Sequence, residues 1–535
     1  MQIKNPLTRI DFYKADHRSQ YPDNTSKIYS NFTSRASRMK GVNEIVFFGL
    51  QYFILKFLIH DFNNGFFNRP LEEVMKRYQR RLDNALGKGV INTDHIAALH
   101  KLGYLPLCIK ALPEGTLVPL KVPCMTIYNT RDEEFWLVNY LETILSNYIW
   151  KPCTSATIAR EYRINFEKYY RETVGDASGA ATILWQGHDF SARGMSFEDD
   201  AAMSGLGHLL SFYGTDTVWA IDYAEDYYFA DSDKEMIGGS IPATEHSVMC
   251  MGGKEGELET VRRLITQVYP SGPIAIVWDT WDYWGGIRNI LPQLKNEIML
   301  RTGHPLGLNK VVIRPDTGNP YRIIVGYFDN ELQHTSSEIE SERVLFINEN
   351  GNYQLRHTDV EITPDEKAGS VQLLWDIFGG STTAEGYHQL APQIGLIYGD
   401  SITLERQIEI LEGLKQKNFA STNVVLGIGS FTYEYVTRDT FGSAMKATYG
   451  ELTIDGEIEE REIFKDPKTD GSGMKKSAKG LLRVDRDENT GKLVLKDQCT
   501  WEEEQGGLLE TVFLNGKILR VQTFEDIRKV VASEL

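Results

Sequence analysis

The chain has 535 residues, too many for a single small core, so we expect two or three structural units. Its formal net charge of −17 at pH 7 argues against nucleic acid and anionic membranes as partners, because an acidic surface repels both. The five widely spaced cysteines argue against a disulfide framework and favour a reducing, cytoplasmic location. Neither a signal peptide nor a transmembrane helix is expected.

Residues 1–180 mix helical stretches with short strands and are expected to form an α/β domain. From residue 181 to residue 430 the chain repeats an apolar run, a polar turn and helix-like sequence. Continuous apolar runs of this length predict strands buried on both faces. They span residues 181–185, 274–278, 311–313, 394–398 and 424–426. Such repetition predicts a parallel sheet, open or closed into a barrel, whose functional residues lie where the strands end.

Three later segments complete the predicted organisation. After residue 400, helical spacing predicts a helix with Ser401 as candidate N-cap and an apolar face made of Leu404, Ile408, Leu411 and Leu414. The polar stretch 328–385 is interpreted as an inserted hairpin or loop. Residues 431–535 are charged and rich in predicted strands.

Polar residues that follow the predicted strands are candidates for chemistry. Glu245 precedes His246, and a histidine beside a carboxylate can act as acid, base or nucleophile, although a buried structural histidine is at least as common. Arg314 and Asp316 follow the run 311–313. Arginine can bind phosphate through two hydrogen bonds, and aspartate can accept from sugar hydroxyl groups. The alternative for this pair is a salt bridge within the loop.

Two glycine-containing turns also follow predicted strands, at Gly399-Asp400 and at Gly427-Ile428-Gly429-Ser430. Small residues in this position let backbone N–H groups and a helix N-terminus approach a phosphate. The alternative is an ordinary tight turn in each case. Neither turn matches a nucleoside-triphosphate loop or a dinucleotide fingerprint, so neither of those folds is inferred.

A third group of residues suits a flat aromatic ligand. Phe190 stands three residues before Arg193 in a glycine-flanked turn, and Asp216 lies within Gly214-Thr215-Asp216-Thr217. Phe190 can stack, Arg193 can donate to a carbonyl and Asp216 can accept from an N–H group. Without further information, an aromatic core residue beside a surface ion pair is the simpler interpretation.

Taken together, these segments resemble the nicotinamide phosphoribosyltransferase family. The resemblance runs in one order through nearly the whole chain, from Asp11-Phe12-Tyr13-Lys14 to Glu525-Asp526-Ile527-Arg528-Lys529. It implies a homodimer of the type II phosphoribosyltransferase fold, in which a central α/β barrel (181–430) joins an additional α/β domain built from both chain ends. Residues 431–535 would pack with residues 1–180, and two active sites would lie at the subunit interface.

The resemblance implies transfer of the 5-phosphoribosyl group from phosphoribosyl pyrophosphate to nicotinamide, giving nicotinamide mononucleotide and pyrophosphate in NAD salvage. Phe190 and the other subunit's Tyr13 would stack on the nicotinamide ring. Arg193 would hold the amide carbonyl, and Asp216 would select a carboxamide over a carboxylate. His246, oriented by Glu245, would be phosphorylated by ATP, which would stimulate synthesis.

The same resemblance assigns the phosphate contacts. Arg314 and Asp316 match contacts to the ribose and its phosphates. The ribose 5-phosphate cradle corresponds to Gly399, Asp400, Gly429 and Ser430. Basic groups that reach pyrophosphate or ATP phosphates, partly from the partner subunit, correspond to Arg35, Arg438, Lys446 and Lys465. Asp279 and Asp316 are expected to help place Mg²⁺.

Three rival functions stay open at this point. A nicotinate phosphoribosyltransferase would perform the same chemistry on the acid, but Asp216 would repel its carboxylate. A catalytically silent binding protein is disfavoured because Arg314, Asp316 and His246 are intact. A barrel glycosidase would need two carboxylates placed across a sugar bond, and no such pair stands out.

Overall fold

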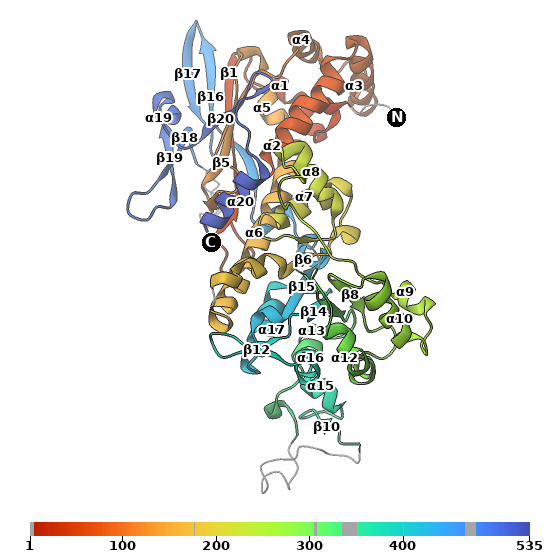
Figure 1. The fold of residues 1–535 in the computed structure, drawn as a ribbon. Helices are drawn as coiled ribbons and strands as arrows, with labels where there is room; N and C mark the ends of the chain where they lie inside the picture. Colours follow the sequence, from red (N-terminus) through yellow and green to blue (C-terminus); the bar gives the residue numbers. More distant parts are fainter. Residues whose placement is uncertain (1–4, 176, 304–307, 334–349, 400, 466–477) are drawn as a thin grey trace.

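Two sheets and a long shared helix organise the protein (Figure 1). The computed structural model describes residues 5–175, 177–303, 308–333, 350–399, 401–465 and 478–535. Helix α6 (Glu142–Thr173) connects the two cores, because Leu145 and Ile149 near its start pack into the core of the first sheet, whereas Tyr162 and Phe166 pack into the core of the second.

The first sheet is antiparallel and combines both ends of the chain. Its seven strands, in spatial order, are β17 (Glu457–Glu462), β16 (Ala444–Ile454), β1 (Thr25–Thr33), β5 (Pro123–Asn129), β3 (Leu107–Ala111), β20 (Glu510–Leu514) and β21 (Lys517–Ile518). The three central strands precede residue 130 and the four outer ones follow residue 443. The expected α/β domain built from both chain ends is therefore confirmed.

Shorter elements surround this sheet. The helices are α1 (His17–Gln20), α2 (Leu50–Tyr52), α3 (Leu71–Leu86), α4 (Asp94–Leu102), α5 (Leu137–Tyr140), α19 (Trp501–Gln505) and α20 (Phe524–Ser533). Two small antiparallel sheets pair β2 (Glu44–Val46) with β4 (Leu117–Pro119), and β18 (Leu481–Arg486) with β19 (Leu493–Cys499). Phe524, Ile527 and Val531 of α20 are buried in a cluster with Leu206 and Ala220 from the helices around the second sheet.

The second sheet is parallel, as predicted. Its six strands, in spatial order, are β7 (Gly214–Thr215), β6 (Gly187–Asp189), β15 (Val424–Ile428), β14 (Ile394–Tyr398), β9 (Val311–Arg314) and β8 (Ile274–Val277). An extended segment connects its two edges, because Gly239 forms a parallel bridge with Gly214 and Ala243 forms one with Ala275. The sheet is thereby curved into a barrel, and all strands end at the same mouth.

Helices surround the barrel in Figure 1. They include α7 (Glu198–Leu209), α8 (Val218–Tyr228), α9 (His246–Met251), α10 (Glu257–Arg263), α11 (Tyr283–Gly285), α12 (Leu291–Met299), α13 (Pro320–Ile324), α17 (Leu404–Gln416) and α18 (Ser430–Tyr433). A small hairpin of β12 (Gly380–Thr382) and β13 (His388–Leu390) lies before β14. Within the described ranges, no helix combines the length and apolar character needed to span a membrane.

Two details of the predicted barrel are wrong. Residues 181–185 belong to a 3₁₀ helix (Ala177–Trp185), and strand β6 begins only at Gly187. A short apolar run does not distinguish helix from strand by periodicity alone. Helix α17 is capped by Thr403, whose hydroxyl accepts from the Arg406 N–H, and not by Ser401, whose φ of 53° is unlike the extended backbone of an N-cap.

The stretch 328–385 differs in part from the predicted hairpin or loop. A short hairpin does form, from β10 (Tyr353–Gln354) and β11 (Glu361–Ile362). The following residues instead form helices α15 (Pro364–Ala368) and α16 (Ser370–Phe378). Val371, Leu374 and Phe378 are buried in the barrel core, so α16 is part of the barrel. Residues 334–349 of the stretch lie outside the described residues.

Candidate active site

The barrel mouth gathers the residues that were predicted at the strand ends. Because the strands are parallel, their carboxyl ends meet at one edge. At this edge lie Phe190 after β6, Asp216 after β7, His246 after the bridging segment, Asp279 after β8, Arg314 and Asp316 at the end of β9, Gly399 after β14, and Gly429 and Ser430 after β15. Asp400 lies outside the described residues.

The aromatic ring of Phe190 lies inside the mouth. It packs beside the inward-facing Ala275, Val312 and Ile397, and the Phe190 N–H donates to the Ile428 carbonyl at 3.0 Å. A Cβ at Gly427 would lie 2.5 Å from this ring, so only glycine leaves room for it there. One face of a flat ligand can therefore meet a ring whose position is fixed by the strand behind it.

Asp216 places a carboxylate at the same mouth. Its backbone N–H donates to the Asp189 carbonyl at 3.0 Å, and its Oδ1 lies 2.9 Å from His188 Nε2. Burial raises the pKa of the Asp216 carboxyl, but surrounding groups outweigh burial and the pKa lies below its ordinary value. These groups are the hydrogen bond and charge of His188, the Ser240 hydroxyl and the charge of Arg314. Asp216 is thus held as an anion.

A buried aspartate fixes the turns that carry these two residues. The Asp189 carboxylate is fully buried and accepts from the Ser191 N–H at 2.9 Å, from the Ser191 hydroxyl at 2.6 Å and from the Thr217 hydroxyl at 2.8 Å. It therefore connects the turn after β6 to the turn after β7. Neither Asp189 nor His188 was among the predicted site residues, although both directly precede Phe190 in the sequence.

Asp279 connects the candidate phosphohistidine to the Arg314–Asp316 turn. Its Oδ2 accepts from the Asp316 N–H at 2.8 Å and from the Thr317 hydroxyl at 2.7 Å, while its Oδ1 lies 3.3 Å from His246 Nε2. The expectation that Glu245 orients His246 is not met, because Glu245 is the N-cap residue of α9 and accepts from the Ser247 hydroxyl instead. The residue that contacts His246 is distant in sequence.

Arg314 and Arg193 supply positive charge at the mouth. Arg314 Nη2 donates to the Thr244 carbonyl at 2.8 Å, whereas its buried Nε has no hydrogen-bond partner among the described residues. A buried donor without a partner fits a site that is completed by an anionic ligand. Arg193 is exposed in the 3₁₀ turn Ala192–Gly194. A Cβ at Gly194 would clash with the Ser430 hydroxyl, so the turn of Arg193 touches the candidate phosphate turn.

The remaining predicted residues do not join the mouth within one chain. Tyr13 is 60% exposed and packs on His17, with ring centroids 5.0 Å apart. Arg35 and Lys446 line a small cavity together with Lys121, which sequence analysis missed. Arg438 lies 3.6 Å from its neighbour Asp439, and Lys465 is exposed. In the described part of the chain, no hydrogen bond, ion pair or ring contact connects these residues to the mouth.

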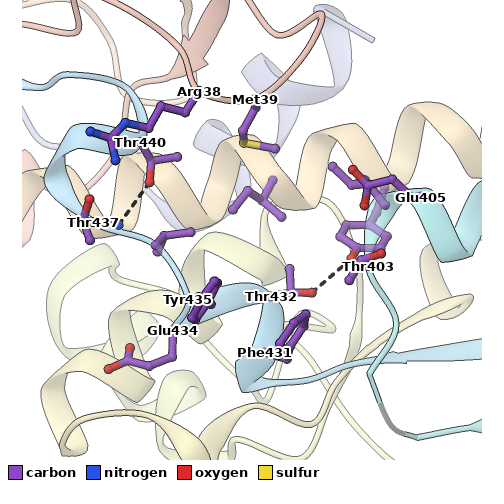
Figure 2. A pocket seen from close by; sticks show the side chains of 14 residues that line it. Arg38, Met39, Thr403, Glu405, Phe431, Thr432, Glu434, Tyr435, Thr437 and Thr440 are labelled. Atoms are coloured by element: carbon purple, nitrogen blue, oxygen red, sulfur yellow. Dashed lines mark hydrogen bonds between the residues drawn. The ribbon is translucent and has the colours of Figure 1, made fainter.

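A separate cavity of about 630 Å³ lies beside α18 (Figure 2). It is lined by Arg38 and Met39 from the segment after β1, and by residues of α6, of the start of α17 and of the chain after β15. It includes none of the strand-end residues described above. Two of its side chains, Phe431 and Tyr435, stack with centroids 5.6 Å apart and rings 6° from parallel. They are 57% and 83% exposed. The two rings therefore form an exposed aromatic pair that begins directly after Ser430.

Two carboxylates at the mouth bear on metal binding. The described residues contain no group of three or more His, Cys, Asp or Glu side chains that could hold a metal ion. Mg²⁺ is often bound by one or two carboxylates together with substrate phosphates, so such a group is not required. Both oxygens of Asp279 face protein donors, and the side chain is 5% exposed. Asp316 is therefore the carboxylate better suited to a metal.

Comparisons with known proteins show the family of the chain. Residues 185–517 match the nicotinate phosphoribosyltransferase (NAPRTase) family, and residues 5–83 match the N-terminal domain of nicotinamide phosphoribosyltransferase. A nicotinamide phosphoribosyltransferase of Acinetobacter baylyi is 51% identical over 99% of this chain and 98% of its own length. One from Xanthomonas campestris is 31% identical over 98% of each chain.

A solved structure is similar in fold. The nicotinate-nucleotide pyrophosphorylase from Pyrococcus furiosus aligns with a TM-score of 0.54 over 100% of this chain and 97% of its own, at 12% identity. This likeness confirms the type II phosphoribosyltransferase architecture of barrel and second domain. Together with the sequence matches, it identifies the chain as a member of the nicotinamide phosphoribosyltransferases within the nicotinate phosphoribosyltransferase (NAPRTase) family.

Proposed function

We propose that the chain transfers the 5-phosphoribosyl group of phosphoribosyl pyrophosphate to nicotinamide, giving nicotinamide mononucleotide and pyrophosphate in NAD salvage. The observation that carries this proposal is the anionic Asp216 at the mouth. Asp216 lies near the ring of Phe190, because His188 contacts both side chains. An anion repels the carboxylate of nicotinate and accepts a hydrogen bond from the amide group of nicotinamide. Family membership supports the same reaction.

The proposed reaction depends on positioning and charge. Phe190 stacks on the nicotinamide ring, and the pyridine nitrogen of nicotinamide attacks the anomeric carbon of the ribose. A C–N bond forms as the C–O bond to pyrophosphate breaks, and the electron pair leaves with pyrophosphate. Arg314 neutralises phosphate charge, and Asp316 accepts from ribose hydroxyl groups. Arg193 donates to the amide carbonyl, and the turns at Gly399 and Gly429 admit the 5-phosphate. Such catalysis needs little proton transfer.

Mg²⁺ is the proposed metal, with Asp316 as its protein ligand for the reasons given above. When bound with the substrate, it would neutralise the charge of the leaving pyrophosphate.

ATP is proposed as an activating co-substrate that phosphorylates His246. The His246 side chain is 46% exposed, so a nucleotide can reach it. Its Nε2 faces Asp279, which favours a proton on that nitrogen and leaves the lone pair of Nδ1 as the nucleophile. An N–P bond would form as the bond between the γ-phosphorus and the bridging oxygen breaks and ADP leaves. Asp279 would stabilise the resulting imidazole charge.

A homodimer is proposed to complete each site. Tyr13 would supply the second stacking face from the partner subunit, and the basic residues on or beside the first sheet would reach the phosphates, namely Arg35, Arg438, Lys446 and Lys465. The exposed Phe431–Tyr435 pair supports a second copy covering this region, because it follows Ser430 directly.

All five cysteines are free and four are buried, which supports a cytoplasmic location.

The test measures product from phosphoribosyl pyrophosphate and Mg²⁺ with nicotinamide or nicotinate, each with and without ATP. Product mainly from the amide, increased by ATP, is expected. Asp216→Asn should weaken discrimination against nicotinate. His246→Ala should abolish ATP stimulation and leave ATP-independent synthesis, and Met251→Ala on the exposed end of the same helix is the matched control. Product mainly from nicotinate would reject the proposed substrate, and full stimulation of His246→Ala would reject the phosphohistidine.

A further inference from the structure

His188 lies between the two residues that are proposed to recognise the base. It is in the middle of β6, and its side chain is 9% exposed. Its Nε2 lies 2.9 Å from Asp216 Oδ1, and its ring centroid lies 4.4 Å from that of Phe190. A single imidazole therefore contacts both the stacking ring and the carboxylate.

Gly214 makes this arrangement possible. It is the register partner of His188 on the neighbouring strand β7, and a Cβ there would lie 2.7 Å from His188 Nδ1. It would also lie 3.0 Å from the carbonyl oxygen of Gly187, which belongs to the backbone and cannot rotate away. With glycine at this position, the imidazole has room on the β7 side while Phe190 covers another side.

The carboxylate of Asp216 needs such a contact to keep one orientation. The terminal torsion of an aspartate is broad, so packing alone sets its plane weakly. Here the side chain is 45% exposed, which leaves it little packing. A hydrogen bond to a charged acceptor is among the stronger polar contacts in proteins. The Ser240 hydroxyl adds a second donor from the bridging segment.

We propose that His188 is a positioning residue for base selection: by holding Asp216 Oδ1, it presents the other carboxylate oxygen to the amide of the bound base. The inference rests on the proposed role of Asp216. His188 need not touch the base. A carboxylate has room for about four acceptor contacts, so donation from His188 and Ser240 leaves capacity for the amide N–H.

The test compares kcat/KM for nicotinamide with kcat/KM for nicotinate in one preparation, so that the ratio does not depend on the folded fraction. His188→Leu should lower the ratio on the order of 10-fold, the effect of losing a hydrogen bond to a charged group. His188→Gln keeps an N–H donor near Nε2 and should restore most of the ratio. In an Asp216→Asn background, His188→Leu should leave the ratio unchanged.

Three results would overturn the inference while leaving the proposed function intact: an unchanged ratio in His188→Leu, no recovery in His188→Gln, or an equal loss in the Asp216→Asn background. A wild-type enzyme without preference for nicotinamide would overturn both. If His188→Leu does not fold, His188→Asn replaces it, since its shorter polar side chain places no donor where Nε2 contacts Asp216 Oδ1. It should lower the ratio in the same direction, and an unchanged ratio in that variant would also reject the inference.

Discussion

The charged side chains of the barrel mouth and the basic residues of the first domain differ in burial and in the number of their partners. Asp279 at the mouth is 5% exposed and has three protein donors within 3.3 Å. In the other region, Arg438 is 54% exposed and Lys446 is 44% exposed, and among the described residues each is paired only with one carboxylate, at 3.6 Å. The mouth is therefore preorganised within one subunit, whereas the side chains of Arg438 and Lys446 are held only by exposed ion pairs among the described residues. Exposed pairs of this kind contribute little stability by themselves.

The strongest test of preorganisation is Arg314→Ala. Removing a partly buried guanidinium from the proposed phosphate contact should lower kcat/KM for phosphoribosyl pyrophosphate by about 30-fold or more, the equivalent of about 2 kcal/mol. Arg314→Lys keeps the charge but loses the fork-shaped donor set, so it should recover only part of the activity. Steady-state kinetics at saturating nicotinamide measure both. Full activity in the alanine variant would remove Arg314 from the phosphate site.

A pair of glycine variants separates the ring pocket from the phosphate turn. Gly427→Ala places a Cβ 2.5 Å from the Phe190 ring, so KM for nicotinamide should rise on the order of 10-fold. At Gly429 the added Cβ meets no atom of the described residues within 4 Å, so Gly429→Ala should change nicotinamide binding little. A rise in KM for phosphoribosyl pyrophosphate in Gly429→Ala alone would place a ligand against that turn. An equal rise in KM for nicotinamide in both variants would contradict the assignment of the base to the Phe190 ring.

Hybrid dimers test whether Tyr13 acts in the partner's site. Tyr13→Ala and Arg314→Ala subunits, which we expect to be nearly inactive when assembled alone, are mixed, dissociated and reassociated. If Tyr13 acts across the interface, one site of each hybrid is intact, and random mixing should restore about a quarter of the wild-type activity. Unmixed samples carried through the same treatment are the control. Absence of any recovery, with hybrids demonstrated by mass spectrometry, would place both residues in the same subunit's site.

The smallest expected effect is a dependence of the free energy of unfolding on pH, to which a buried histidine in each of the two regions contributes. Burial lowers the pKa of His208, beside the barrel, to about 4, and lowers that of His95, in α4 of the first domain, to about 4. Since the ordinary value is 6.5, the unfolded chain binds the proton first as the pH falls. Stability is therefore lost between pH 6.5 and about 4, by an amount on the order of a few kcal/mol for a fully buried histidine.

His208→Gln should reduce this loss. The free energy of unfolding is measured at pH 7.5 and at pH 5 for both proteins, with His60→Gln as a control at a side chain that is 60% exposed. The difference between the two pH values should be smaller in His208→Gln than in the wild type. An identical difference would show that another group controls the acid sensitivity.

Local sequence predicted the barrel where strands are continuous and apolar. The runs 274–278, 311–313, 394–398 and 424–426 all became parallel strands, and their polar ends meet at the mouth. The run 181–185 was assigned wrongly, and Ile408, predicted on the buried face of α17, is 42% exposed. In both cases tertiary packing decided what a short pattern left ambiguous.

Side-chain partners were harder to predict than site residues. Glu245 was chosen for His246 because it is adjacent, but the contact comes from Asp279, 33 residues further on. The contact of His188 with Asp216 likewise spans 28 residues and depends on the register of β6 with β7. Such pairs follow from sheet order and strand register, which a single sequence does not display.

The pairing of β1 with β16 has a consequence for synthesis. The Asn31 side chain donates to the Lys446 carbonyl, 415 positions later in the chain. On the ribosome β1, β5 and β3 emerge early, yet β16 and β20, which cover the two sides of this trio, follow only after the whole barrel. Unpaired strand edges promote association with other chains. The nascent protein therefore carries an unfinished sheet through most of its translation, and the last strands to be made determine when the first domain is complete.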